Sequence, residues 1–196
     1  KGYGALVYDT RNCGESDGEI TTFGLLEVND VRGALAFVQA QPGVDPQRIG
    51  VLGHSLGGAT AIMATARIPQ IRAVIAESTY ASLEDNVRSN LRNLVGLPSF
   101  PFAPLVIFWG EWETGVTISQ VRPIDEIASI SPRPVLIIHG EQDITIPTAN
   151  AYRLYETARE PKELYIIPNA GHGLPTHREE YVQKVTGFFD RYLLQR

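Results

Sequence analysis

Short apolar runs alternate along this chain with segments of mixed polarity. The runs predict β-strands at residues 5–8, 48–52, 73–76, 135–139 and 164–167. Apolar residues recur every three or four positions within residues 25–38 and 177–194, and residues 57–67 are rich in alanine, so helices are expected there. Continuous apolar strands separated by helices are typical of a parallel sheet buried on both faces. The pattern therefore predicts the α/β class, with a mostly parallel sheet covered by helices on both faces.

The alternation breaks between residues 81 and 131. This interval is too long for a simple crossover loop, because connections in compact domains usually have about 4–6 residues. We expect it to form a small helical cap or lid, inserted into a core of residues 1–80 and 132–196. Aromatic residues of the cap predict either an apolar acyl pocket or the cap's own core; they are Phe100, Phe102, Phe108, Trp109 and Trp112.

Residues 53–58 read Gly-His-Ser-Leu-Gly-Gly and follow a predicted strand directly. They match the G-x-S-x-G nucleophile elbow, in which a strained strand-to-helix turn exposes the serine hydroxyl. Gly53 and Gly57 are expected to be small because they crowd the turn, and the His54 side chain is expected to point away from the hydroxyl. Ser55 is then the nucleophile, and the backbone N–H of Leu56 donates to an oxyanion.

Two other interpretations of this turn are open. A glycine-rich strand-to-helix turn can occur without any chemistry. A phosphate-binding loop is less consistent with the sequence, because the G-K-[ST] ending of a P-loop is absent.

A serine hydroxyl needs a base, and in elbow-containing hydrolases the acid and then the histidine follow the serine along the chain. Asp143 lies just after the strand at 135–139, where functional groups gather at the carboxyl ends of parallel strands. Glu141 is the competing acid and Asp125 a more distant one. Asp143 also has an ordinary interpretation, since aspartate is common in turns.

His172 is the predicted base, because it lies between two glycines in the loop after the last predicted strand. His177, near the start of the final helix, is the alternative. His139 falls within a strand and is expected to be structural. The chain contains no H-E-x-x-H motif, and its histidines are too widely spaced to predict a metal site, so neither a metal nor a cofactor is expected.

Three segments resemble the α/β-hydrolase superfamily: GHSLGG at 53–58, HGEQDITIP at 139–147 and NAGHG at 169–173. Residues 9–16 are similar to its D-x-R-G-x-G-x-S segment, with Asn12 in place of a glycine. The chain looks most like the serine aminopeptidase-like and dienelactone hydrolase-like branches. This resemblance covers nearly the whole chain and implies a catalytic triad of Ser55, Asp143 and His172.

The superfamily has strands upstream of residue 5, and a loop there supplies a second oxyanion donor. Neither is found in this sequence, which opens on Lys1-Gly2-Tyr3-Gly4. We therefore expect an N-terminal portion to be missing, and the second donor to be absent from these residues. The resemblance also places a strand between residues 5–8 and 49–52, so a gap is expected there.

Composition and charge limit the classes of partner that this chain is expected to bind. The 196 residues carry a net charge of −5, which does not favour nucleic acid, and no apolar run is long enough to span a membrane. Cys13 is the single cysteine, so it forms no internal disulfide, and we expect it to be a small buried residue. A reducing, cytoplasmic compartment is favoured.

The sequence thus predicts a serine hydrolase that cleaves a small-molecule ester, with an amide as the second choice, through an acyl-enzyme. Two alternatives stay open: a serine peptidase of the aminopeptidase-like branch, and a non-catalytic binding module on the same fold.

Overall fold

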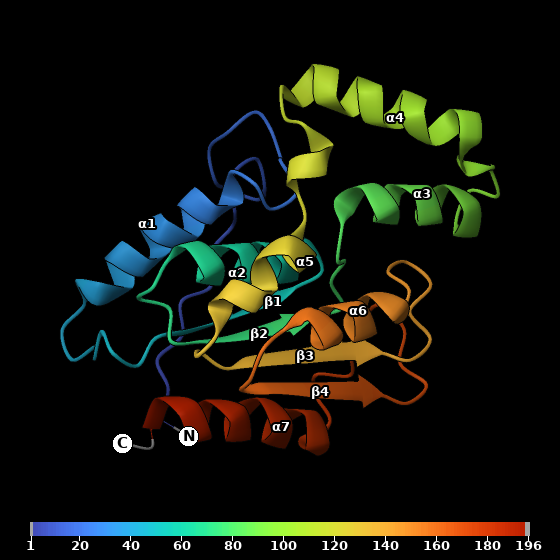
Figure 1. Ribbon diagram of the computed structural model, residues 1–196. Coiled ribbons are helices and arrows are strands. Elements are labelled where there is room, and N and C mark those ends of the chain that lie inside the picture. Colours follow the sequence, from blue (N-terminus) through green and yellow to red (C-terminus); the bar gives the residue numbers. More distant parts are fainter. Residues whose placement is uncertain (1, 195–196) are drawn as a thin grey trace.

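Four parallel strands form the central sheet of the protein, which was analysed as a computed structural model that describes residues 2–194. In sheet order they are β1 (Gly50–His54), β2 (Ala73–Glu77), β3 (Val135–Gly140) and β4 (Lys162–Ile167). Each strand pairs in parallel with the next along the chain, as Figure 1 shows. The parallel sheet predicted from the four later apolar runs is confirmed.

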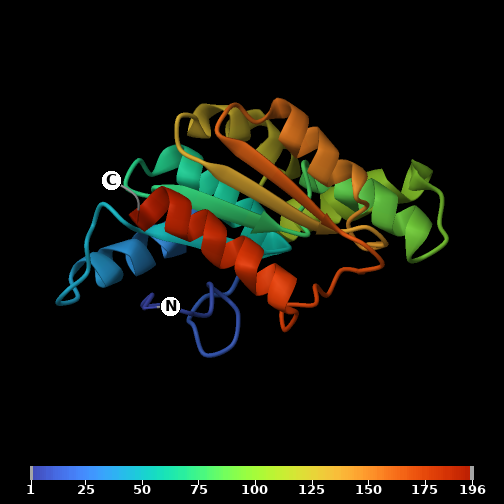
Figure 2. The same cartoon turned by 90° about the horizontal axis from the view of Figure 1, so that it is seen from below.

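Helices cover both faces of this sheet. Alternate side chains of β2 point to opposite faces: Val74 packs in one cluster with Ile62, and Ile75 packs in another with Phe188. The first face is covered by α2 (Leu56–Arg67), α5 (Pro123–Glu126) and α6 (Ala149–Thr157). The opposite face is covered by α7 (Glu179–Phe189) and the π-helical turn η3 (Asp190–Leu194), and α1 (Glu27–Gln39) packs on α2. Figures 1 and 2 show α7 alone on its side of the sheet.

The interval between β2 and β3 is helical, as expected. It begins with α3 (Leu83–Asn93) and α4 (Ser99–Thr114), and Figure 1 shows α4 lying over α3 on the side away from the sheet. The 3-10 turn η1 (Ile118–Gln120) leads back to α5 and to η2 (Ile127–Ile130). Ile127 and Ile130 are fully buried among core residues. The division of the chain at residues 81 and 131 stays a prediction.

The strand predicted at residues 5–8 is wrong. These residues join no sheet, and the side chain of Val7 is 92% exposed. The physical reason is that a strand exists only through hydrogen bonds to a neighbour, and β1 pairs on one side only, with β2. The gap expected between residues 5–8 and 49–52 is consistent with this arrangement.

The segment from residue 9 to residue 16 forms a compact turn. The Asp9 carboxylate accepts a hydrogen bond from the N–H of Glu15, and the Ser16 hydroxyl donates to the Asp9 carbonyl at 2.6 Å. Arg11 forms a two-pronged ion pair with Asp30 of α1, with a shortest distance of 2.7 Å. The turn is therefore tied to α1.

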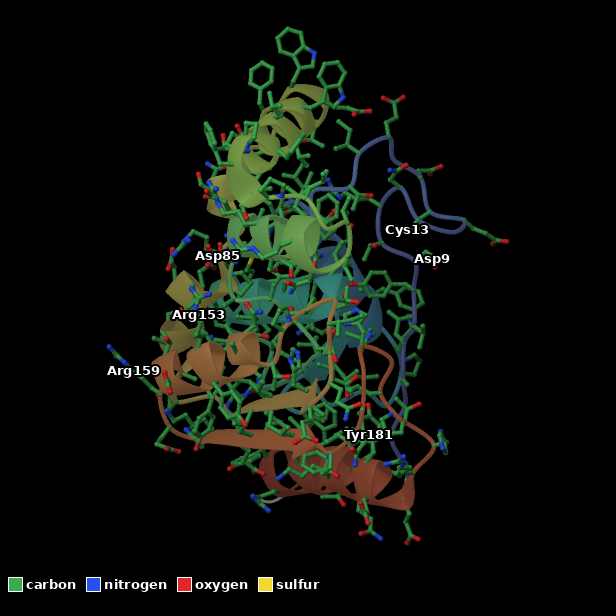
Figure 3. The ribbon with its side chains drawn as sticks, turned by 90° about the vertical axis from the view of Figure 1, so that its right-hand side faces the viewer. Asp9, Cys13, Asp85, Arg153, Arg159 and Tyr181 are labelled. Atoms are coloured by element: carbon green, nitrogen blue, oxygen red, sulfur yellow. The ribbon has the colours of Figure 1, made fainter. Side chains whose placement is uncertain are left out.

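Two expectations from composition can be compared with this structure. Cys13 is exposed, and the expectation that it is buried is wrong, because its turn projects away from the sheet, as Figure 3 shows. Among residues 2–194, none of the helices combines the length and the apolar character that crossing a bilayer requires.

Candidate active site

Ser55 occupies a sharp turn between β1 and α2. Its φ of 56° is unusual for a residue with a side chain, and such strain persists only where the surroundings impose it. Two hydrogen bonds of 2.8 Å hold the turn: the Ser55 N–H donates to the Glu77 carbonyl, and the Thr79 hydroxyl donates to the Ser55 carbonyl. Glu77 is the last residue of β2 and Thr79 follows it, so the neighbouring strand fixes the position of the serine.

The glycines of the turn do not share one role. A methyl group at Gly53 would overlap the backbone carbonyl of Gly57, so Gly53 must lack a side chain. A methyl group at Gly57 would meet nothing within 4 Å, so the expectation that crowding requires a glycine there is wrong. The second crowded position is Gly58, where an added methyl group would lie 2.8 Å from the Thr79 side chain.

Three side chains predicted from separate segments come together at the carboxyl ends of the strands. Nε2 of His172 lies 3.0 Å from the Oγ of Ser55. Nδ1 of the same ring lies 2.8 Å from Oδ2 of Asp143. This geometry allows a proton to pass from the hydroxyl to the imidazole while the carboxylate orients the ring and stabilises its charged form.

Asp143 is held by the loop that follows β3. Its Oδ1 accepts hydrogen bonds from the N–H groups of Thr145 (2.9 Å) and Ile146 (2.8 Å). Burial alone would raise the pKa of Asp143, but hydrogen bonds from His139, Ile146 and His172 outweigh burial and hold it below its ordinary value. The carboxylate is therefore ionised at neutral pH, as a partner for an imidazolium must be.

The loop that carries His172 packs tightly against the end of β3. A side chain at Gly140 would overlap the carbonyls of Ala170 and Gly171, so the two segments touch through their backbones. The N–H of Gln142 donates to the Ala170 carbonyl at 2.8 Å. This contact holds the loop that carries His172 against the loop that carries Asp143.

The alternative acids and bases lie in other contacts. Glu141 accepts a hydrogen bond from the N–H of Asn169, and Asp125 forms an ion pair with Arg122. His177 is exposed to solvent. His139 is fully buried, and its Nε2 lies 2.8 Å from the Ile146 carbonyl, which agrees with a structural placement.

The His54 side chain lies beside the imidazole of His172, and its expected orientation away from the Ser55 hydroxyl stays a prediction. The two ring centroids are 5.0 Å apart, so His54 packs against the predicted base. Burial and the neighbouring His172 lower the pKa of His54, with a smaller contribution from His139, although Asp143 acts in the opposite direction. His54 is therefore neutral at neutral pH and adds no positive charge beside His172.

The backbone supplies one candidate oxyanion donor. Leu56 is the first residue of α2, and the N–H groups of a first helical turn have no acceptor within their helix. Its N–H follows Ser55 directly, and the positive end of the helix dipole favours negative charge there. The second donor that the resemblance implies is not assigned among residues 2–194.

The aromatic side chains of the cap are exposed and form no closed core. Phe100, Trp109 and Trp112 are 80%, 66% and 75% exposed, and Ala103 is the only buried residue of α4. The expectation that they are the cap's own core is wrong, because α4 packs on α3 and η1 while these aromatic side chains stay exposed. An acyl pocket made from them stays a prediction.

Two further features bear on ligands. A hollow of about 190 Å³ lies between the end of β4 and α7, lined among others by Asn169, Arg178 and Tyr181, and it includes none of the three converging side chains. Within residues 2–194, no three histidine, cysteine, aspartate or glutamate side chains are grouped as metal ligands would be.

Comparisons with known proteins place the chain in a family. Residues 21–196 match the model of the prolyl oligopeptidase family. YqkD of Bacillus subtilis is 32% identical over 193 residues, which cover 96% of this chain and 63% of that protein. YfhR of Escherichia coli K12 is 33% identical over 174 residues, which cover 88% of this chain and 54% of that protein. Both relatives are uncharacterised, and the chain spans less than two thirds of either.

Solved structures agree on the fold. An esterase from Pyrococcus furiosus superposes with a TM-score of 0.73 at 22% identity, covering 94% of this chain and 69% of that one. An acylaminoacyl peptidase from Pyrococcus horikoshii superposes with a TM-score of 0.66 at 24% identity, covering 88% of this chain and 28% of that one. The predicted resemblance to the α/β hydrolases is confirmed: the chain has the α/β-hydrolase fold and belongs to the prolyl oligopeptidase family.

Proposed function

We propose that this protein is a serine hydrolase that cleaves a carboxylic ester of a small molecule through an acyl-enzyme intermediate. The observation that carries the proposal is the continuous relay from the Ser55 hydroxyl through His172 to Asp143, with distances of 3.0 and 2.8 Å. Membership of a hydrolase family supports the same conclusion.

Acylation begins when the Oγ of Ser55 attacks the ester carbonyl and its proton passes to Nε2 of His172. The carbonyl oxygen becomes an oxyanion, which accepts a hydrogen bond from the Leu56 N–H. The C–O bond to the alcohol then breaks, and His172 returns the proton to the leaving oxygen. Asp143 stays ionised throughout and stabilises the imidazolium through Nδ1.

Deacylation repeats these steps with water in place of the serine hydroxyl. His172 takes a proton from the attacking water, and the bond between the acyl carbon and the serine oxygen breaks. The same proton restores the Ser55 hydroxyl, and the carboxylic acid leaves. Every proton and bond in these proposed steps is accounted for by the substrate, water and the three side chains.

An ester is the preferred substrate, because an alcohol leaves more easily than an amine. The exposed aromatic side chains of α4 also offer apolar surface for an acyl group. The competing function is cleavage of a peptide or aminoacyl amide. It is favoured by the family to which the chain belongs and by the fold it shares with an acylaminoacyl peptidase.

Labelling with a fluorophosphonate probe tests the proposal. We expect a single adduct on Ser55, no adduct on Ser55→Ala, and a loss of about 10⁴-fold or more in kcat for that variant. Nitrophenyl esters of increasing acyl length, compared with aminoacyl nitroanilides, then separate an esterase from a peptidase. An adduct on another serine contradicts the nucleophile, and a folded protein that is not labelled at all supports the non-catalytic binding module.

A further inference from the structure

His139 is a fully buried polar residue that the mechanism does not use. It lies in β3, where it pairs with Ile166 of β4, so its backbone belongs to the interior of the sheet. Its side chain lies against Asp143 and Ile146, in the loop that follows β3. A buried imidazole requires hydrogen-bond partners, and their identity indicates what it does.

The partners of its Nε2 atom connect His139 to the acid. The Ile146 carbonyl lies 2.8 Å from Nε2, and because a carbonyl only accepts, the proton must be on Nε2. Oδ2 of Asp143 lies 3.4 Å from the same nitrogen. This distance is longer than an optimal hydrogen bond. The N–H therefore donates mainly to the Ile146 carbonyl, and the carboxylate is a second, weaker neighbour of the same N–H.

The backbone of Ile146 links His139 to Asp143. Its carbonyl accepts from His139, and its N–H donates to Oδ1 of Asp143 at 2.8 Å. Oδ2, the oxygen that faces His139, is also the one that binds His172. His139 of β3 is therefore connected to both oxygens of the carboxylate: to Oδ1 through the Ile146 backbone, and to Oδ2 by an approach of 3.4 Å.

We propose that His139 is a positioning residue for Asp143, which holds the carboxylate in the orientation that His172 requires. This inference rests on the proposed function for its catalytic consequence. Its structural part, the fixed hydrogen bond between Asp143 and His172, can be measured whether or not the protein turns over a substrate.

Three substitutions separate positioning from packing. His139→Gln keeps an N–H close to the position of Nε2, and His139→Asn places its N–H near Nδ1 instead. His139→Leu fills the space with no donor. We expect the leucine and asparagine variants to lose about 10- to 100-fold in kcat, as when a catalytic group moves by about 1 Å, with KM nearly unchanged. The glutamine variant should stay within about threefold of the wild type.

The second readout is the downfield proton NMR signal of the proton on Nδ1 of His172. It should be retained in His139→Gln and broadened or lost in His139→Asn and His139→Leu, with circular dichroism used to select folded variants. If the leucine variant does not fold, the glutamine and asparagine variants decide the question.

An unchanged signal in the asparagine variant overturns the inference, as does an equal loss of kcat in folded glutamine and asparagine variants. Absence of hydrolysis in the wild type, with a signal that still depends on His139, overturns the proposed function and leaves the positioning role supported.

Discussion

At the scale of single residues, the two glycines of the G-x-S-x-G pattern around Ser55 have different surroundings. Gly53 faces the backbone of Gly57, so nothing larger than hydrogen fits. Gly57 faces open space and lies in the first turn of α2. The motif is symmetrical about the serine, but the steric requirement is not.

We predict opposite effects for alanine at these two positions. Gly53→Ala forces the backbone apart and should lower the free energy of unfolding by about 3 kcal/mol, near the upper end for overpacking, and abolish labelling of Ser55. Gly57→Ala should raise the free energy of unfolding by less than about 1 kcal/mol, because alanine has a higher helix propensity than glycine. Urea unfolding and probe labelling measure both, and equal destabilisation by the two substitutions would contradict this account.

The residues of the candidate site differ in how far the sequence predicts them. Ser55, Asp143 and His172 each follow an apolar run, and the carboxyl ends of parallel strands meet at one edge of the sheet. Contacts between the sheet and the helices that cover it have no comparable pattern in the sequence. The pair formed by Glu77 and Tyr181, which are 104 positions apart, depends on where α7 crosses the sheet.

At the scale of elements, that pair links α7 to β2. The Tyr181 hydroxyl donates a hydrogen bond to the Glu77 carboxyl, and both side chains are buried. Burial raises the pKa of Glu77 and outweighs the opposite effect of the hydrogen bond from Tyr181. The backbone carbonyl of Glu77 also accepts a hydrogen bond from the N–H of Ser55, so this pair lies directly beside the turn that carries Ser55.

We predict that Glu77 makes stability decrease with rising pH. Because its pKa in the folded state lies above the unfolded value of about 4.3, the folded state binds the proton more tightly. The stabilising contribution is complete below the unfolded pKa and is lost as pH rises through the folded pKa. Glu77→Gln cannot ionise, so the wild type should lose stability relative to this variant as pH increases.

Urea unfolding of both proteins from pH 4 to pH 8 measures this difference. Tyr181→Phe serves as the second variant: without the hydroxyl donor the pKa of Glu77 should rise further, which moves the pH-dependent loss to higher pH. A wild-type-minus-variant difference that is flat, or that grows with pH, would show that Glu77 does not titrate in this range.

Element prediction succeeded where the pattern reflects burial and failed where it does not. The four apolar runs that became strands each have a strand beside them, whereas residues 5–8 have the same composition and no partner. The helix α6 was not predicted, because only Asn150, Ala151 and Leu154 of it are buried and its apolar pattern is short. A strand depends on its neighbours, which the local sequence does not contain.

At the scale of the whole molecule, the sheet has an unprotected side. β1 pairs with β2 alone, so its other edge presents backbone N–H and C=O groups that no strand within residues 2–194 satisfies. Leu52 in this strand is 44% exposed. The strand that the resemblance places beside β1 stays a prediction. An open parallel edge with apolar side chains is a template for pairing with another chain.

We predict that this chain on its own self-associates through β1 at micromolar concentrations. Leu52→Lys should raise the monomeric fraction, because a charge on an edge strand opposes pairing with a second copy. Phe37→Lys is the matched control: Phe37 is 57% exposed on α1, so it removes an exposed apolar residue of similar character away from the edge. Light scattering coupled to size-exclusion chromatography, over a range of concentrations, measures the three proteins. A wild-type chain that stays monomeric across that range contradicts the prediction, and an equal effect of both lysine substitutions would assign association to general surface hydrophobicity instead of to the open edge of the sheet.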